Sequence, residues 1–247
     1  MIMNRLFEKC MHYMKFDYRA FLLLTLTFIV MTVIGTLTHE FGHYSVAKCL
    51  GYEARINYYS SAYWNNDLDK YLDDTYDKYS NEIKNGLDFP EKEKFQTTIN
   101  KYHADGFWIS LGGPLQTMLT GTIGLLLLLF FRKKYITPDH VKLTGWILIF
   151  MSLFWLRQVA NLFMAVLFFI VNGQPSLRGD EARLAYRLDI NIWTIQVITG
   201  LLGAAVLFII LKLLPKNLVL TFILSGLTGG LLGYYLWLIK FGQYILP

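Results

Sequence analysis

One stretch of the sequence decides the class of protein. Residues 21 to 51 read FLLLTLTFIVMTVIGTLTHEFGHYSVAKCLG, an apolar run that passes directly into HEFGH at residues 39 to 43. About 20 apolar residues in a helix cross the roughly 30 Å of hydrocarbon in a bilayer. The stretch is therefore predicted to be a transmembrane helix with ionisable side chains near its far end, where such residues are costly and usually functional.

Four further apolar stretches extend this prediction to the whole chain. They cover residues 107 to 131, 143 to 171, 192 to 214 and 217 to 239. Of the 247 residues, 54% are hydrophobic and 17% are charged, whereas about a quarter are charged in ordinary soluble domains. We therefore expect an all-α, multi-pass integral membrane protein with about five transmembrane helices. The net charge is +5, and the basic residues lie mostly at helix ends rather than in one patch, which favours contact with membrane lipids over nucleic acid.

These stretches divide the chain into five expected segments. They are a basic amphipathic segment (1 to 20), the first transmembrane helix (21 to 51), a polar insertion (52 to 105), the second and third transmembrane helices with the segment that follows them (106 to 190), and two C-terminal transmembrane helices (191 to 247). Within the insertion, residues 55 to 64 are rich in tyrosine and serine and predict a strand, hence a small membrane-associated β element. Residues 65 to 101 are charged and are expected at the surface.

The histidine pair near the end of the first helix predicts a metal site. His39 and His43 are four residues apart, so both imidazoles lie on one helical face and can bind a single metal ion. Glu40 beside them is the expected general base. Zinc prefers histidine and carboxylate ligands, and a catalytic zinc site has three protein ligands and an open position for water. Zn²⁺ is therefore the expected cofactor, and a third ligand must come from elsewhere in the chain.

The third ligand is expected in the segment that follows the third apolar stretch. The first helix leaves the membrane near His43, and two further crossings return the chain to that same face. Asp180 lies there and is the preferred candidate. Glu181 is adjacent and remains an alternative ligand.

Three sequence elements together resemble the site-2 protease family of intramembrane zinc metalloproteases. HEFGHYSVAKCLG at residues 39 to 51 is similar to the zinc-binding helix of that family, and GGPL at residues 112 to 115 is similar to its Gly-Pro-Leu element. The spacing of Asn172, Pro175 and Asp180 resembles its third signature. Two positions depart from the pattern, because Glu181 stands where the family usually has glycine and Thr117 where it usually has asparagine.

The resemblance covers roughly residues 20 to 190 and implies both a fold and an activity. The implied fold has a three-helix zinc-binding core. The implied activity is that of a zinc metalloendopeptidase, which hydrolyses peptide bonds of membrane-spanning or membrane-proximal protein substrates. The implied site has Glu40 as the catalytic base, three metal ligands, and substrate-binding or supporting residues: His39, His43, Asp180, Gly113, Pro114, Asn172 and Pro175.

Several alternatives stay open at the level of the sequence. Arg157 lies near the middle of the third apolar stretch with Asn161 one turn later, and a charge there needs a partner or a wet cavity. The pair either contributes to the site, by polarising the scissile carbonyl or supporting the Asp180 region, or forms a structural hydrogen-bonding hub. The chain itself is either the implied protease, a different membrane zinc hydrolase, or an inactive scaffold of the same fold. Orientation is also open, since the Lys and Arg distribution places the site outside the cytoplasm and the resemblance implies the opposite.

Overall fold

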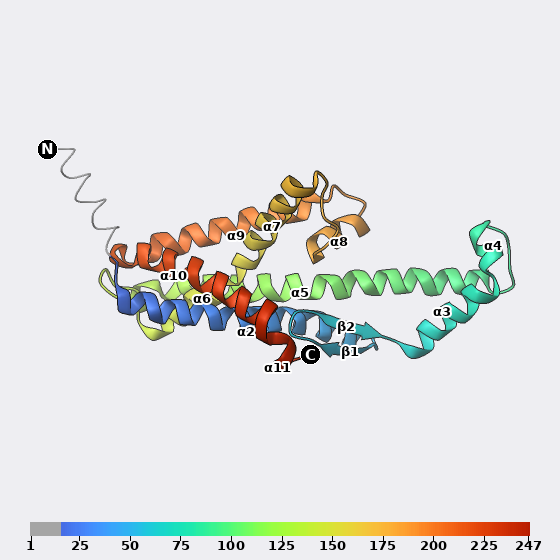
Figure 1. Cartoon of the computed structure of the whole chain (residues 1–247), viewed down its shortest axis with the longest axis horizontal. Helices are drawn as coiled ribbons and strands as arrows, with labels where there is room; N and C mark the ends of the chain where they lie inside the picture. Colours follow the sequence, from blue (N-terminus) through green and yellow to red (C-terminus); the bar gives the residue numbers. More distant parts are fainter. Residues whose placement is uncertain (1–15) are drawn as a thin grey trace.

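The computed structural model describes residues 16 to 247 and is almost entirely helical, with one two-stranded sheet. The expected N-terminal segment lies mostly outside the described residues. Figure 1 shows the elements in order: α2 (Tyr18–Cys49), β1 (Glu53–Ile56), β2 (Ser61–Trp64), α3 (Asn66–Lys78), α4 (Ser80–Lys84), α5 (Lys92–Tyr135), α6 (Leu143–Ser152), η1 (Leu153–Trp155), α7 (Leu156–Asn172), α8 (Asp180–Arg187), α9 (Trp193–Leu213), α10 (Lys216–Tyr234), η2 (Tyr235–Phe241) and α11 (Gly242–Ile245).

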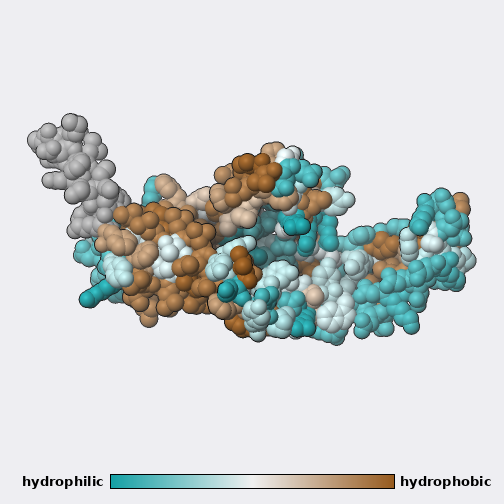
Figure 2. All heavy atoms as spheres, viewed as in Figure 1, coloured by the Kyte–Doolittle hydropathy of each residue, from teal (hydrophilic) through white to brown (hydrophobic). Residues whose placement is uncertain are grey.

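The prediction of five membrane-crossing helices is confirmed in length and composition. Five helical spans in the described part of the chain are long and apolar enough to cross a membrane: Tyr18–Cys49, Lys92–Tyr135, Leu143–Asn172, Trp193–Leu213 and Lys216–Ile245. Apolar side chains cover the body formed by these helices, whereas the arm built from α3, α4 and the start of α5 is mostly hydrophilic (Figure 2). This distribution is consistent with a multi-pass membrane protein whose polar arm projects beyond the bilayer.

Local signals at both ends define α2, the helix that carries the histidine pair. The Asp17 carboxylate accepts hydrogen bonds from the backbone N–H groups of Arg19 and Ala20, at 2.9 and 3.0 Å, which is the usual side-chain cap of a helix N-terminus. The helix ends at Cys49, and Gly51 follows with φ of +86°. A left-handed residue after the last turn is favoured by glycine, so the predicted stop at Gly51 is confirmed.

Small residues allow α2 to pack closely against two other helices. A Cβ atom added to Gly42 would lie 2.5 Å from the carbonyl oxygen of Gly112 in α5, and one added to Gly229 in α10 would lie 2.5 Å from the carbonyl oxygen of Thr25. Such close backbone approach is typical of membrane helices with glycine at their interface. The Gly42 and Gly112 contact brings α5 directly alongside the histidine-bearing turns of α2.

The polar insertion differs from the expectation in its secondary structure. The stretch predicted as one strand is an antiparallel hairpin in which Glu53 pairs with Trp64 and Ile56 with Ser61. Residues expected only as a charged surface segment form α3, α4 and the first turns of α5. At 1.5 Å per residue, the 44 residues of α5 extend about 66 Å, roughly twice the hydrocarbon thickness, and the start of the helix lies within the arm (Figure 1).

The third apolar stretch is interrupted rather than continuous. A single 3₁₀ turn, η1, separates α6 from α7, and it lies against two glycines of α5: a Cβ atom on Gly124 would be 2.7 Å from the backbone nitrogen of Ser152, and one on Gly121 would be 3.2 Å from that of Trp155. Beyond this turn, α7 diverges from α5 and leads to α8 (Figure 1). The chain therefore returns to the end of the molecule where α2 terminates, as the crossing count predicts.

Candidate metal centre

Helix α2 and the start of α8 bring three potential metal ligands together. His39 and His43 lie one turn apart in α2 and are buried, and Asp180 is the first residue of α8. The Asp180 Oδ2 atom lies 2.9 Å from His39 Nε2 and 3.3 Å from His43 Nε2, and the two Nε2 atoms are 3.2 Å apart. These residues form a group that could hold a metal ion, since all three ligand atoms lie within 4.8 Å of one another.

Hydrogen bonds on the opposite side of each ring determine which imidazole nitrogen carries the proton. His43 Nδ1 lies 2.6 Å from the carbonyl oxygen of Ile109, which can only accept, so this nitrogen must be the donor. The backbone N–H of Gly113 lies at a longer 3.3 Å and does not change this assignment. The Thr117 hydroxyl donates to the Gly113 carbonyl at 3.0 Å, so it accepts from His39 Nδ1 at 2.9 Å.

With Nδ1 as the donor in each ring, the Nε2 atoms face the Asp180 carboxylate, and each ring in its neutral form would direct an Nε2 lone pair toward it. A proton between these atoms would satisfy only one of the three close contacts, whereas a single cation can satisfy all three. Imidazole rings that donate their second N–H to a carbonyl or a hydroxyl are also typical of metal-binding histidines, because that hydrogen bond fixes the tautomer and the ring orientation. The donor set thus fits a divalent metal ion.

Glu40 lies beside the ligand group without belonging to it. The residue is only 4% exposed, and it is absent from the set of converging ligand atoms. The Arg157 guanidinium approaches the Glu40 carboxylate at 3.8 Å, and the backbone of Ser61, the first residue of β2, faces the same carboxylate. The acid predicted as the general base therefore lies between the metal ligands, one cation and the edge of the hairpin.

Of the two adjacent carboxylates, Asp180 rather than Glu181 belongs to the group that could hold a metal ion. Glu181 lies outside this group, and its carboxylate accepts hydrogen bonds from the Asn161 amide at 3.1 and 3.2 Å. Burial raises the pKa of Glu181 above its usual range. These hydrogen bonds join α7 to the first turn of α8. They therefore help to fix the position of Asp180, the first residue of α8.

The remaining predicted site residues fall into two groups. Gly113 and Pro114 are buried in α5 next to the histidines, and a Cβ atom on Gly113 would lie 2.6 Å from His39 Nε2 and closer still to His43 Nε2. Asn172 and Pro175 are instead exposed in and after the last turn of α7, where the Asn172 amide donates to the Phe168 carbonyl at 2.8 Å. Nothing in these contacts assigns Asn172 or Pro175 a role in the site.

Because Gly113 lacks a side chain, the two histidine rings can lie close to α5, and adding a methyl group there tests the position of the metal ion. We expect Gly113→Ala to weaken metal binding by about tenfold or more, because the added methyl group would push both ligand rings out of position. Gly230→Ala is a matched control, since Gly230 is also helical and a Cβ atom there meets nothing within 4 Å. Metal content of the two purified variants measures the effect. Equal metal content in both would contradict the proposed position of the ion.

Comparison of the chain with protein-family models, curated proteins and solved structures finds no match. The functional interpretation therefore rests on the arrangement of the residues themselves.

Proposed function

We propose that this chain is an intramembrane zinc metalloprotease that hydrolyses peptide bonds of membrane-spanning or membrane-proximal substrates. The observation that carries the proposal is the convergence of His39, His43 and Asp180, with Glu40 beside them, at one end of helices of membrane-crossing length. The motif resemblance to site-2 proteases supports the same function. Under this proposal, the polar arm and the hairpin both belong to the face from which substrate approaches.

The composition of the ligand group favours zinc in a catalytic role. Two imidazole nitrogens and one carboxylate oxygen suit Zn²⁺, and a set of three protein ligands leaves a fourth tetrahedral position for water. A structural zinc site would normally have four protein ligands. Within residues 16 to 247, the group contains only three such residues.

The neighbouring residues can carry out the steps of hydrolysis. When bound, zinc supplies a Lewis acid and lowers the pKa of a water molecule to about 7. Glu40 accepts the proton of the attacking water and passes it to the nitrogen of the leaving amine. Arg157, 3.8 Å from Glu40, offers a fixed positive charge next to the carboxylate that can stabilise negative charge developing on the substrate carbonyl oxygen.

The hairpin offers a means of binding an extended substrate. A peptide bond in an intact transmembrane helix is shielded by the helix hydrogen bonds, so the substrate must unwind before water can attack. The backbone of β2 begins at Ser61 beside Glu40, and an extended peptide that pairs with this strand would have its backbone held next to the base. The hairpin itself is anchored at its turn, where Tyr58 N–H donates to the Leu246 carbonyl and Trp237 Nε1 donates to the Tyr58 carbonyl.

Hydrolysis of a transmembrane peptide by the purified full chain tests the proposal. We expect the protein, reconstituted in lipid nanodiscs, to cleave members of a panel of single-span peptides within or next to their apolar segment, as located by mass spectrometry. A chelator should stop cleavage and added Zn²⁺ should restore it. Cleavage that survives complete removal of metal would contradict the proposal. A metal-loaded protein that cleaves no peptide of the panel would instead favour the inactive scaffold, and hydrolysis confined to small non-peptide amides or esters would favour another zinc hydrolase.

A further inference from the structure

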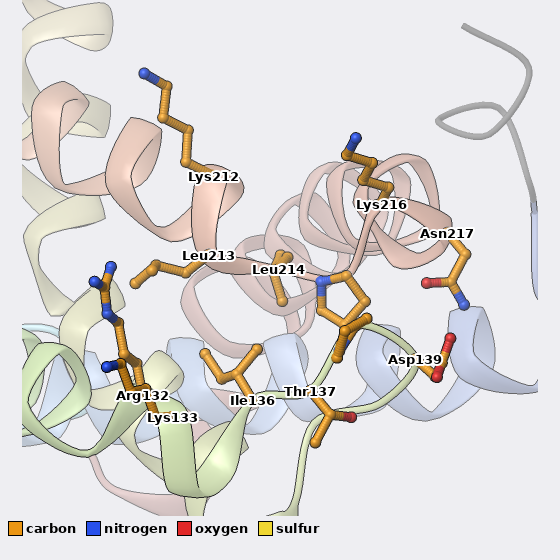
Figure 3. Close-up of a pocket in the computed structure, with 12 residues that line it drawn as sticks. Arg132, Lys133, Ile136, Thr137, Asp139, Lys212, Leu213, Leu214, Lys216 and Asn217 are labelled. Atoms are coloured by element: carbon orange, nitrogen blue, oxygen red, sulfur yellow. The ribbon is translucent and has the colours of Figure 1, made fainter. Parts of the chain in front are cut away.

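A second polar feature lies at the opposite end of the helices from the metal centre. A cavity of about 740 Å³ opens where α5 ends and where α9 turns into α10. Figure 3 shows its lining residues, with side chains from the loop after α5 on one side and from the turn between α9 and α10 on the other. This cavity is separate from the candidate metal centre. None of the three potential ligands His39, His43 and Asp180 is among its lining residues.

The charged residues around this cavity are predominantly basic. Arg132 and Lys133 come from the last turn of α5, while Lys212 and Lys216 flank the turn between α9 and α10. Among the described residues that line the cavity, Asp139 is the one carboxylate. The Lys212 Nζ atom lies 4.3 Å from the centre of the Phe208 ring. This contact places the ammonium group where the apolar helix surface meets the polar residues around the cavity. The cavity therefore carries a net positive charge.

The floor of the same cavity is apolar. Ile136, Leu213, Leu214 and Pro215 line it between the basic groups. Helix surfaces next to the cavity are also apolar and exposed, with Phe130 in α5 80% exposed and Phe208 in α9 58% exposed. A soluble anion such as inorganic phosphate would use only the charges, whereas a phospholipid would use both the charges and the apolar surface below them.

The backbone at this position adds to the preference for an anion. Helix α10 begins at Lys216 directly after Pro215, and within residues 16 to 247 no side-chain hydrogen bond caps its N-terminus. The N–H groups of a first helical turn favour negative charge. They lie in the wall of the cavity through Lys216 and Asn217.

We infer that this cavity binds the phosphodiester headgroup of an anionic phospholipid, with the acyl chains lying along the exposed apolar surfaces of α5 and α9. The inference is independent of the proposed protease activity, since it uses none of the metal-site residues. Basic pockets between membrane helices are suited to anionic headgroups, and each Lys or Arg near the membrane surface contributes to that attraction. The predicted consequence is a lipid that joins the C-terminal end of α5 to the turn between α9 and α10.

Lipid retention by the intact protein tests the inference. The full chain is purified from nanodiscs that contain equal amounts of phosphatidylglycerol and phosphatidylcholine, and retained lipid is identified by native mass spectrometry. We expect phosphatidylglycerol to be retained at least about tenfold over phosphatidylcholine. The double variant Arg132→Gln with Lys212→Gln should lose this preference. The charge-preserving pair Arg132→Lys with Lys212→Arg should keep it, which separates a charge effect from misfolding.

A matched pair of neutralised lysines controls for the overall loss of charge. Lys84→Gln with Lys101→Gln removes two positive charges from exposed positions on the polar arm, and this variant should retain phosphatidylglycerol as the unmodified chain does. Equal retention of the two lipids by the unmodified chain, or equal loss in both neutralised pairs, would overturn the inference. Displacement of the preference by millimolar inorganic phosphate, with no lipid retained, would show a free-phosphate site and would also overturn it.

Discussion

Replacing Glu40 by glutamine is expected to lower the rate of peptide hydrolysis by roughly 10² to 10⁴-fold while leaving the fold and the bound metal in place. Glutamine has nearly the same shape as glutamate and can still form hydrogen bonds, but it cannot accept the proton of the attacking water. Glu40 is not one of the three converging ligands, so its charge is not required to hold the ion. Cleavage of a transmembrane peptide and metal content, both measured on the same purified variant, give the result.

Glu93→Gln is a suitable control for this variant, because Glu93 is an exposed glutamate in the first turn of α5, within the polar arm. It should cleave at the rate of the unmodified chain. Undiminished cleavage by Glu40→Gln would overturn the assignment of the base. Loss of metal together with activity in Glu40→Gln would show that the carboxylate acts on the ion rather than on the substrate.

The sequence was sufficient to predict the helices and the histidine face, for physical reasons. An apolar run long enough to span a bilayer has few alternatives to a helix, and the i, i+4 spacing of His39 and His43 places them on one face of it. Asp180 was the preferred candidate from the sequence, but the adjacent Glu181 remained an alternative. Because consecutive helical residues point about 100° apart, the orientation at the start of α8 had to be known before Asp180 could be separated from Glu181.

Other features could not be predicted, because they depend on contacts between distant parts of the chain. The polar first turns of α5, up to residue 101, read like a surface segment, yet they are helical and Phe95 in them is buried. Thr117 and the Ile109 carbonyl, which set the histidine tautomers, lie 78 and 66 residues from their partners. One signal pointed to Thr117: it lies four residues after Gly113 and therefore on the same face of α5.

The second prediction with a large effect concerns the ligands. His39→Ala and Asp180→Ala should each weaken zinc binding by at least about 100-fold, since removal of a direct ligand costs more than the 10 to 100-fold typical of its supporting partners. Both variants should lose hydrolysis together with the metal. His103→Ala should change neither property, because His103 is exposed in the polar part of α5 and lies outside the ligand group. Circular dichroism of each variant checks that its helices remain.

Zinc per chain, measured by elemental analysis on the purified protein and these three variants, tests the metal centre most directly. The predicted result is one zinc ion per chain in the unmodified protein and in His103→Ala. Almost no zinc is expected in His39→Ala or Asp180→Ala. A folded unmodified chain that takes up no zinc, or a His39→Ala variant that keeps one zinc per chain, would contradict the proposed centre.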